Sequence, residues 1–249
     1  MRLRLPSIIV LFILSVAQSC TSSYRAGTVT YQQYRITSAQ VQDAGLTEVI
    51  KPYSDSVNST MNTVIGVAEE PLEKSMPASS LGYFMTDAYL MMARQKFSET
   101  VDISFMNYGG IRLTQLPAGN ITIGKIFELM PFDNMLILQK MTGAELQALL
   151  DHIAAKGGWP ISGMTMHIRN KKAVDVVIGG KPLSLSATYT VANSDFVANG
   201  GDEAWMLRKI PQHNIGYLMR DAIFDYIKWL KGVGKNISAT KEIRVINVE

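Results

Sequence analysis

The segment MLILQKMTGAELQALLDHIAAKGG, residues 135–158, carries the clearest structural signal in this chain of 249 residues. Met135–Gln139 is a short apolar run typical of a strand. Thr142 and Glu145 then stand at the spacing of a capping box, in which the threonine hydroxyl accepts from a backbone N–H and the glutamate reaches back. Apolar residues follow at helical spacing, and Gly157 stands where a left-handed C-terminal cap is favoured. The segment therefore predicts a strand followed by a capped helix.

Patterns on both sides of this segment predict an alternation of strands and helices. The expected strands are Val29–Ile36, Met61–Ala68 with a bulge at Gly66, Val101–Asn107, Tyr189–Ala192 and Ile243–Val248, with a hairpin of Met164–Ile168 and Ala173–Ile178 around Asn170-Lys171. The expected helices are Ala39–Val57, which Pro52 kinks or ends, Ser79–Phe97 and Ile215–Lys231. Because strands and helices interleave without a repeat period, we predict an α+β fold of mixed α/β layers, with sheets flanked by helices, over residues 37–249.

Residues 1–19 have the pattern of a secretory signal peptide. Two arginines form a positive start, and Ile8–Val16 is an apolar core too short to cross a bilayer comfortably. Cys20 follows in a stretch that resembles a bacterial lipoprotein cleavage box, so it is predicted to be acylated and to anchor the mature chain to a membrane. An ordinary secretory signal followed by an incidental cysteine is the alternative. Residues 20–36 are predicted to be a tether and a first strand, and the protein is expected in the cell envelope, facing the periplasm.

The composition excludes several classes of protein. The chain has 24 Lys and Arg against 21 Asp and Glu, and removing Arg2 and Arg4 with the signal leaves 22 − 21 = +1. A binder of nucleic-acid polymers needs a basic surplus to displace counterions, so that class is excluded. A single cysteine excludes an internal disulfide framework and a cysteine-based zinc site. An apolar content of 47% excludes global disorder.

The sequence contains no recognisable set of metal or cofactor ligands. Two-metal phosphoesterases need a cluster of Asp, His and Asn side chains, but the three histidines, His152, His167 and His213, have no second ligand-type residue at close spacing. His152 falls on the helix expected at residues 143–156, where a structural or solvated role is favoured over catalysis. We therefore predict no catalytic residue, no metal ligand and no cofactor within this chain.

Three loops carry residues suited to a ligand site. NYGGIR ends at Arg112, PFDN contains Phe132 and Asn134, and NSDFVANGGD contains Phe196 and Asp202. Together they offer two aromatic rings for a flat heterocycle, an amide for a base edge, an acid for ribose hydroxyls and an arginine for a phosphate. Taken singly, each loop also fits a plain alternative. The first can be a turn followed by a surface arginine, the second can hold a core phenylalanine, and the third can be a hydrophobic helix start or a surface loop.

The longer stretches around these loops resemble a known family. NYGGIRLTQLPAGNITIGKIFELMPFDNMLILQKMTGAELQALL, residues 107–150, and TYTVANSDFVANGGDEAW, residues 188–205, are similar to the C-terminal domain of the bacterial 5′-nucleotidase/UDP-sugar hydrolase family. The signatures N-x-G-G-I-R, G-x-I-T, P-F-x-N, M-T-G-x-E-L and aromatic-x-x-x-G-G-D occur in the order of the family. The resemblance extends from about Ala39 to Val248, nearly the whole mature chain.

The resemblance implies a role in substrate recognition and a set of residues for it. Phe132 and Phe196 would stack on the base, Asn134 would bond to the base, Gly157 would line the base pocket, Asp202 would hold the ribose hydroxyls and Arg112 would approach the phosphate. The family often supplies two further arginines before the helix expected at Ser79–Phe97. In this chain that stretch has only Lys74 as a basic residue, a candidate substitute.

Full-length members of the family also carry an N-terminal metallophosphoesterase domain with the metal ligands, and its motifs do not occur here. The first hypothesis is therefore the nucleotide- or nucleoside-recognition half of a 5′-nucleotidase, acting with a separate metallophosphoesterase chain that holds the divalent metals. The second is a nucleoside-binding envelope lipoprotein without enzymatic activity. The third hypothesis is a structural lipoprotein that has lost its ligand.

Overall fold

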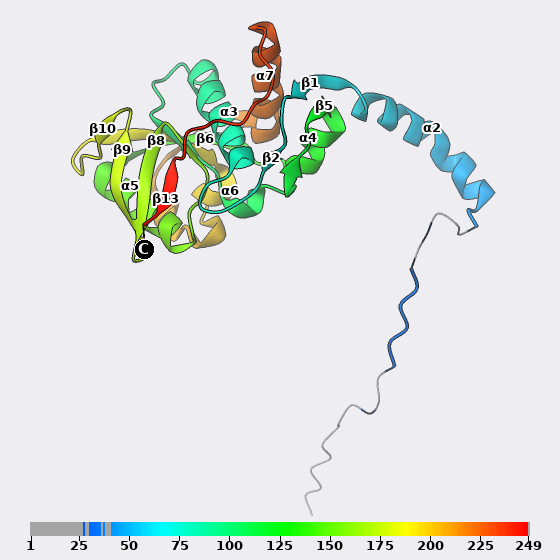
Figure 1. Ribbon diagram of the computed structural model, residues 1–249, viewed down its shortest axis with the longest axis horizontal. Helices are drawn as coiled ribbons and strands as arrows, with labels where there is room; N and C mark the ends of the chain where they lie inside the picture. The colour runs from blue at the N-terminus through cyan, green and yellow to red at the C-terminus, as the bar shows by residue number, and fades with distance from the viewer. Residues whose placement is uncertain (1–26, 28–29, 36, 38–40, 249) are drawn as a thin grey trace, which may run out of the picture. The chain divides into compact units, whose positions relative to one another are not determined.

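The computed structural model describes residues 27, 30–35, 37 and 41–248 of the chain (Figure 1). Compact packing divides the sequence into two units, residues 1–48 and 49–249. Within the first unit, the described residues 30–35 and 41–43 have no regular secondary structure, and helix α2 (Ala44–Met61) begins there and continues into the second unit. All other elements belong to the second unit. Cys20 and the expected signal peptide lie outside the described residues.

A five-stranded sheet is the middle layer of the second unit. Its strands follow the order β12 (Gln212–Leu218), β6 (Met135–Thr142), β11 (Thr188–Ser194), β3 (Ile103–Phe105) and β7 (Ile161–Ser162). The pairing of β11 with β3 is parallel, and the other pairings are antiparallel. Alternate residues along a strand face opposite sides of a sheet, and on β11 Val191 joins one hydrophobic cluster while Ala192 joins the other.

Helices cover one face of this sheet, and a helix with a second sheet covers the other. The first face carries α3 (Ser80–Lys96), α4 (Ile123–Leu129) and α7 (Met219–Gly232), whose buried side chains form one cluster. The second face carries α5 (Gly143–Ala155) and a four-stranded sheet with the order β10 (Lys181–Pro182), β9 (Lys172–Ile178), β8 (Met164–Arg169) and β13 (Val245–Asn247). Figure 1 shows α5 beside β8 and β9, with α3 and α7 on the other side.

Shorter elements complete the fold. Two-stranded ladders pair β1 (Val64–Ala68) with β5 (Gly119–Thr122), and β2 (Leu72–Glu73) with β4 (Gln115–Leu116). The remaining turns are helix α6 (Asp195–Ala198) and the 3₁₀ turns η1 (Tyr108–Gly110), η2 (Gly201–Glu203) and η3 (Trp205–Lys209). The arrangement confirms the expected α+β fold of mixed layers. No helix among residues 41–248 is long and apolar enough to cross a membrane.

Several local expectations are confirmed in detail. The Thr142 hydroxyl accepts from the Glu145 backbone N–H, and the Glu145 carboxylate accepts from that of Thr142, so the capping box begins α5. Gly157 follows the helix with a φ of +93°, as a left-handed cap requires. The hairpin of β8 and β9 turns at Asn170-Lys171, where both residues have positive φ.

Three expected elements differ from the structure. The strand expected at Val29–Ile36 is wrong, since the described residues 30–35 make no strand. The helix expected at Ala39–Val57 begins at Ala44 and runs to Met61, with Pro52 inside it rather than at its end. Residues 215–218 belong to β12 instead of the final helix, because strand pairing with β6 extends to Leu218 opposite Met135.

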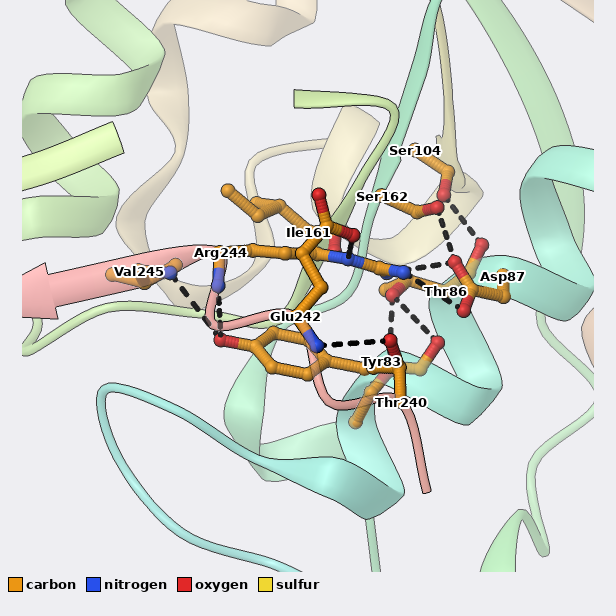
Figure 2. A network of polar contacts seen from close by, with 11 residues as sticks. Tyr83, Thr86, Asp87, Ser104, Ile161, Ser162, Thr240, Glu242, Arg244 and Val245 are labelled. Carbon is orange, nitrogen blue, oxygen red and sulfur yellow. Dashed lines mark hydrogen bonds and ion pairs between the residues drawn. The ribbon is translucent and has the colours of Figure 1, made fainter. Parts of the chain in front are cut away.

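A buried arginine attaches the C-terminal segment to α3 (Figure 2). The two terminal nitrogens of Arg244 donate to the Asp87 carboxylate at 2.7 and 3.0 Å, and the guanidinium lies 5.0 Å from the Tyr83 ring centre. The Tyr83 hydroxyl oxygen accepts from the backbone N–H groups of Arg244 and Val245. Burial opposes the charge of Arg244, but hydrogen bonds and attraction from Asp87 and Glu242 outweigh it and raise the pKa of the guanidinium. The contacts fix the path of the chain into β13.

Candidate functional site

The register of the five-stranded sheet brings the three candidate loops to one edge. The loop with Arg112 follows β3, and the loop with Phe196 and Asp202 follows β11, which runs parallel to β3. The loop with Phe132 and Asn134 precedes β6, which is antiparallel to β11, and Ser194 at the end of β11 pairs with Leu136 near the start of β6. The ends of two strands and the beginning of a third therefore meet at the same edge of the sheet.

These loops enclose a pocket of about 640 Å³. Five of the predicted site residues line it: Arg112, Phe132, Asn134, Phe196 and Asp202. Three methionines, Met106, Met130 and Met219, add apolar surface, and the remaining lining comes from Asn107, Gly109, Gly110, Pro131, Asp133 and Ser194. An apolar pocket with a few polar groups converging on it is the usual form of a small-molecule site.

The two phenylalanines are partly accessible, unlike most aromatic residues of the core. Phe132 is 38% exposed and Phe196 is 45% exposed, whereas Phe105 is 1% exposed. The Phe196 ring packs directly against Gly201: a Cβ at that glycine would lie only 2.4 to 2.6 Å from three of its ring atoms. The glycine thus permits the close approach that holds the ring at the pocket.

An acidic residue orients Asn134. Its side-chain Nδ2 donates to Asp195 Oδ1 at 3.2 Å, and the same oxygen accepts from the backbone N–H groups of Met135 and Phe196. A carboxylate only accepts, so the amide nitrogen of Asn134 must face Asp195. The amide oxygen is consequently the group of Asn134 that remains for a donor outside this contact.

Asp202 lines the pocket and has an unusual backbone conformation. Asp202 has φ 50° and ψ 35°, and Glu203 after it has φ 65°, both in the left-handed region that residues with a side chain seldom adopt. Asn107, 7% exposed, donates from Nδ2 to Asp202 Oδ2 at 2.6 Å and so connects the loop after β3 to the loop after β11. Asn107 stands in the NYGGIR motif, but its role could not be predicted from the sequence, because only the fold brings the two loops together.

Two cations lie at the Arg112 end of the site. Arg112 donates to the Gly109 carbonyl at 3.3 Å, and its guanidinium lies 5.5 Å from the Phe132 ring centre. Lys74 donates to the Ile111 carbonyl at 2.8 Å and lies 4.0 Å from the Tyr108 ring centre. Burial, and then repulsion by Arg112, lower the pKa of the Lys74 amine. Lys74 is not among the residues that line the pocket, so its main contact is with the backbone that leads into Arg112.

A second arginine braces the loop that carries Phe132. Arg220, 8% exposed at the start of α7, donates to the carbonyl oxygens of Met130 and Phe132 and pairs with Asp133 at 2.6 Å. Its guanidinium also lies 4.3 Å from the Phe127 ring centre. Because the carbonyl of Phe132 itself is bound, the position of this ring at the pocket depends on α7.

Comparison with known families identifies this arrangement. Residues 64–209 match the family model described as "5'-nucleotidase, C-terminal domain", which covers more than half of the chain. The chain belongs to the 5′-nucleotidase C-terminal domain family. The matched residues include all five predicted residues that line the pocket.

Individual relatives agree with this family. A 5′-nucleotidase of Vibrio cholerae is 27% identical over 79% of this chain and 36% of the relative, and cell wall protein Lmo0130 of Listeria monocytogenes is 29% identical over 88% and 30%. The crystal structure of a 5′-nucleotidase precursor from Thermus thermophilus superposes with a TM-score of 0.72, 29% identity, and coverage of 82% of this chain and 43% of that one. This 5′-nucleotidase C-terminal domain protein thus spans about a third of the length of the two curated relatives.

Gly157 is the predicted site residue that the structure does not bring into the pocket of this 5′-nucleotidase C-terminal domain. It is not among the lining residues, and a Cβ there would meet Met76 at 3.5 Å. Its position is explained by the end of α5, where the left-handed turn returns the chain toward β7. A methionine that sequence reasoning did not select, Met219, lines the pocket because β12 pairs with β6 and ends beside it. Residues 41–248 contain no group of acidic, His or Cys side chains able to hold a metal ion.

Proposed function

We propose that this protein is the nucleotide- or nucleoside-recognition half of a 5′-nucleotidase-type hydrolase. The observation that carries the proposal is the joint position of Phe132, Phe196, Asn134 and Asp202 at one pocket in a member of this family. The two partly exposed rings stack on the base, and the free amide oxygen of Asn134 accepts from a base N–H. The Asp202 carboxylate accepts from the ribose hydroxyls.

Arg112 holds the phosphate group of a nucleotide in this proposal. It is the only basic residue among those that line the described pocket, and no ion pair with an acidic side chain is recorded for it or for Lys74 in the described part of the chain. A guanidinium presents a planar fork to phosphate oxygens. Lys74 adds positive charge near Arg112 while it donates to the Ile111 carbonyl, and it does not contact the ligand directly.

Calorimetry with adenosine and with AMP tests the recognition role. Arg112→Ala is expected to weaken AMP by about 10-fold, the loss of one charge-assisted hydrogen bond, and to leave adenosine within about 2-fold. The matched control is Arg169→Ala, which removes an exposed arginine of β8 that does not line the pocket. If the unaltered protein binds neither adenosine nor AMP, the proposal is wrong.

Hydrolysis requires a metal-bearing catalytic chain in this proposal. Mixing this protein with candidate metallophosphoesterase chains should raise metal-dependent release of phosphate from AMP above the rate of either component. Vigorous turnover by this chain alone would refute the division of labour.

A binding protein without enzymatic activity is the second candidate, and one observation favours it. Arg112 is the only positively charged residue among the described residues that line the pocket, whereas several lining residues suit a base and a sugar, so the site is better suited to a nucleoside than to a phosphate group. Equal affinities for adenosine and AMP, together with no rate increase in any mixture, would select this candidate.

We also propose that the protein is anchored in the cell envelope through an acylated Cys20, facing the periplasm. The support is the pattern of residues 1–20 and the likeness to a cell wall protein of Listeria. Cys20→Ala should move the protein from the membrane fraction to the soluble fraction. An unchanged membrane fraction, with no acyl group found on Cys20 by mass spectrometry, would contradict the anchor.

A further inference from the structure

The turn that presents Asp202 is held from outside the pocket, by the end of helix α5. Asp202 and Glu203 are consecutive non-glycine residues with positive φ, and unlike Asn170-Lys171 they do not stand in a β-hairpin turn that favours this conformation, so contacts from neighbouring elements offset its cost. Two side chains near the end of α5 supply such contacts. His152 Nε2 lies 3.0 Å from the Asp202 carbonyl oxygen, and Lys156 pairs with Glu203 at 2.8 Å.

The chemistry of the His152 contact is unambiguous in direction. A carbonyl oxygen only accepts, so Nε2 carries the hydrogen and donates it to Asp202. The hydrogen bond from Lys156, followed by its charge, lowers the pKa of the Glu203 carboxyl, so the second contact is an ion pair at neutral pH. Both residues of the left-handed turn are therefore bound by side chains at the C-terminal end of α5, His152 within the helix and Lys156 directly after it.

The His152 ring is itself fixed by packing. Its centre lies 5.6 Å from that of Trp159 in an edge-on arrangement, and Trp159 stacks on Phe105 at 6.1 Å. Trp159 and Phe105 are buried at 3% and 1% exposure. Phe105 is the last residue of β3, two residues before Asn107, which donates to the Asp202 carboxylate. Asp202 is thus held at its carbonyl by His152 and at its carboxylate by Asn107.

From this arrangement we infer that His152 is a positioning residue for sugar recognition: it fixes the Asp202 carboxylate where two vicinal ribose hydroxyls can donate to it. The inference rests on the proposed function, because it assigns to His152 the selectivity of that same site for a ribose with both hydroxyls. His152 does not line the pocket and touches no ligand. Its effect reaches the sugar through Asp202 alone.

Selectivity between sugars separates positioning from a merely structural role. Adenosine donates from both ribose hydroxyls, whereas 2′,3′-dideoxyadenosine offers the same base without them. If His152 only stabilised the fold, its loss would lower the melting temperature and weaken both ligands equally, or neither. If it aims the carboxylate, its loss weakens adenosine and leaves dideoxyadenosine unchanged.

The experiment measures dissociation constants of both ligands by calorimetry for the full chain and four variants. His152→Phe keeps an aromatic ring against Trp159 but removes the N–H donor, and His152→Gln supplies an amide N–H in place of Nε2. Lys156→Ala removes the second contact, in case both His152 variants fail to fold. His167→Ala is the matched control, since His167 lies on β8 and does not line the pocket.

The preference of the unaltered protein for adenosine over dideoxyadenosine should fall about 3- to 10-fold in His152→Phe, the loss of one hydrogen bond. It should be largely restored in His152→Gln, fall by a smaller factor in Lys156→Ala and stay unchanged in His167→Ala. An unchanged preference in a folded His152→Phe protein, or in Lys156→Ala should neither His152 variant fold, overturns the inference and leaves the proposed function intact. Failure of the unaltered protein to bind adenosine overturns both.

Discussion

Truncation of either pocket phenylalanine should weaken ligand binding far more than it weakens the fold. Phe196 is 45% exposed and Phe132 is 38% exposed, so the protein buries only about half of the surface of each residue. Full burial of a phenylalanine stabilises a protein by about 1.5–3 kcal/mol, so half burial corresponds to about 1 kcal/mol. A fully buried phenylalanine replaced by alanine costs about 3–5 kcal/mol instead.

The loss of stacking has a different size. An aromatic ring stacked on a base contributes about 1–3 kcal/mol, so Phe132→Ala and Phe196→Ala should each raise the dissociation constant for adenosine about 5- to 150-fold. Melting curves would report the change in stability, and calorimetry with adenosine the change in affinity. Trp205→Ala is the matched control, because Trp205 is 57% exposed and does not line the pocket.

Stability and affinity, measured together, distinguish a ring of the pocket from a ring of the core. If either phenylalanine variant loses several kcal/mol of stability while the affinity per folded molecule is unchanged, that ring is part of the core rather than of the site. A loss of affinity in Trp205→Ala equal to that in the two phenylalanine variants would show that the assay reports general damage to the surface.

Three further changes test other parts of the molecule. Gly143→Ala should destabilise the fold by about 1–3 kcal/mol in chemical denaturation, because a Cβ there would lie 1.9 Å from a backbone oxygen; an unchanged midpoint would contradict the packing at the start of α5. Asp87→Ala leaves the Arg244 charge buried without its main partner and should cost about 3 kcal/mol, whereas a loss below about 1 kcal/mol would mean that solvent replaces the pair. A hydrogen bond from Lys140 lowers the pKa of the Glu99 carboxyl, so ionised Glu99 stabilises the fold at neutral pH, and this stabilisation is lost as the pH falls below about 4.3. The difference in melting temperature between the wild type and Glu99→Gln should therefore vanish on acidification. A difference that persists at pH 2 would refute this role of Glu99.

The elements that sequence could predict are those whose signal is local. Two residues, Thr142 and Glu145, specify the start of α5, and Asn170-Lys171 specify the hairpin turn. Each of these pairs creates its own hydrogen bonds or backbone conformation within four residues. No distant part of the chain is needed to make the prediction correct.

Two strand segments that the sequence did not predict depend on distant partners. Leu218 stands at helical spacing from Ala222, which favours a helix over residues 215–218, but pairing of Leu218 with Met135 makes them the end of a strand. The short strand β7, unrecognised in the sequence, exists because Ser162 and Ile161 pair with β3 across the sheet. Two residues carry too little pattern to predict a strand, and only the neighbouring strand determines it.

The candidate site likewise combines residues that short motifs predict with contacts that only the fold creates. Its aromatic and polar residues were selected through short motifs, since Phe132, Asn134, Phe196 and Asp202 each stand in a recognisable loop, and the sheet register then brings those loops together. The contacts that set their orientation had no such signal. His152 and Asp202 are fifty residues apart, and their contact depends on the packing of α5 against the same sheet that ends in the Asp202 loop. Substitutions at His152 are therefore expected to alter sugar selectivity without changing any motif that identifies the family.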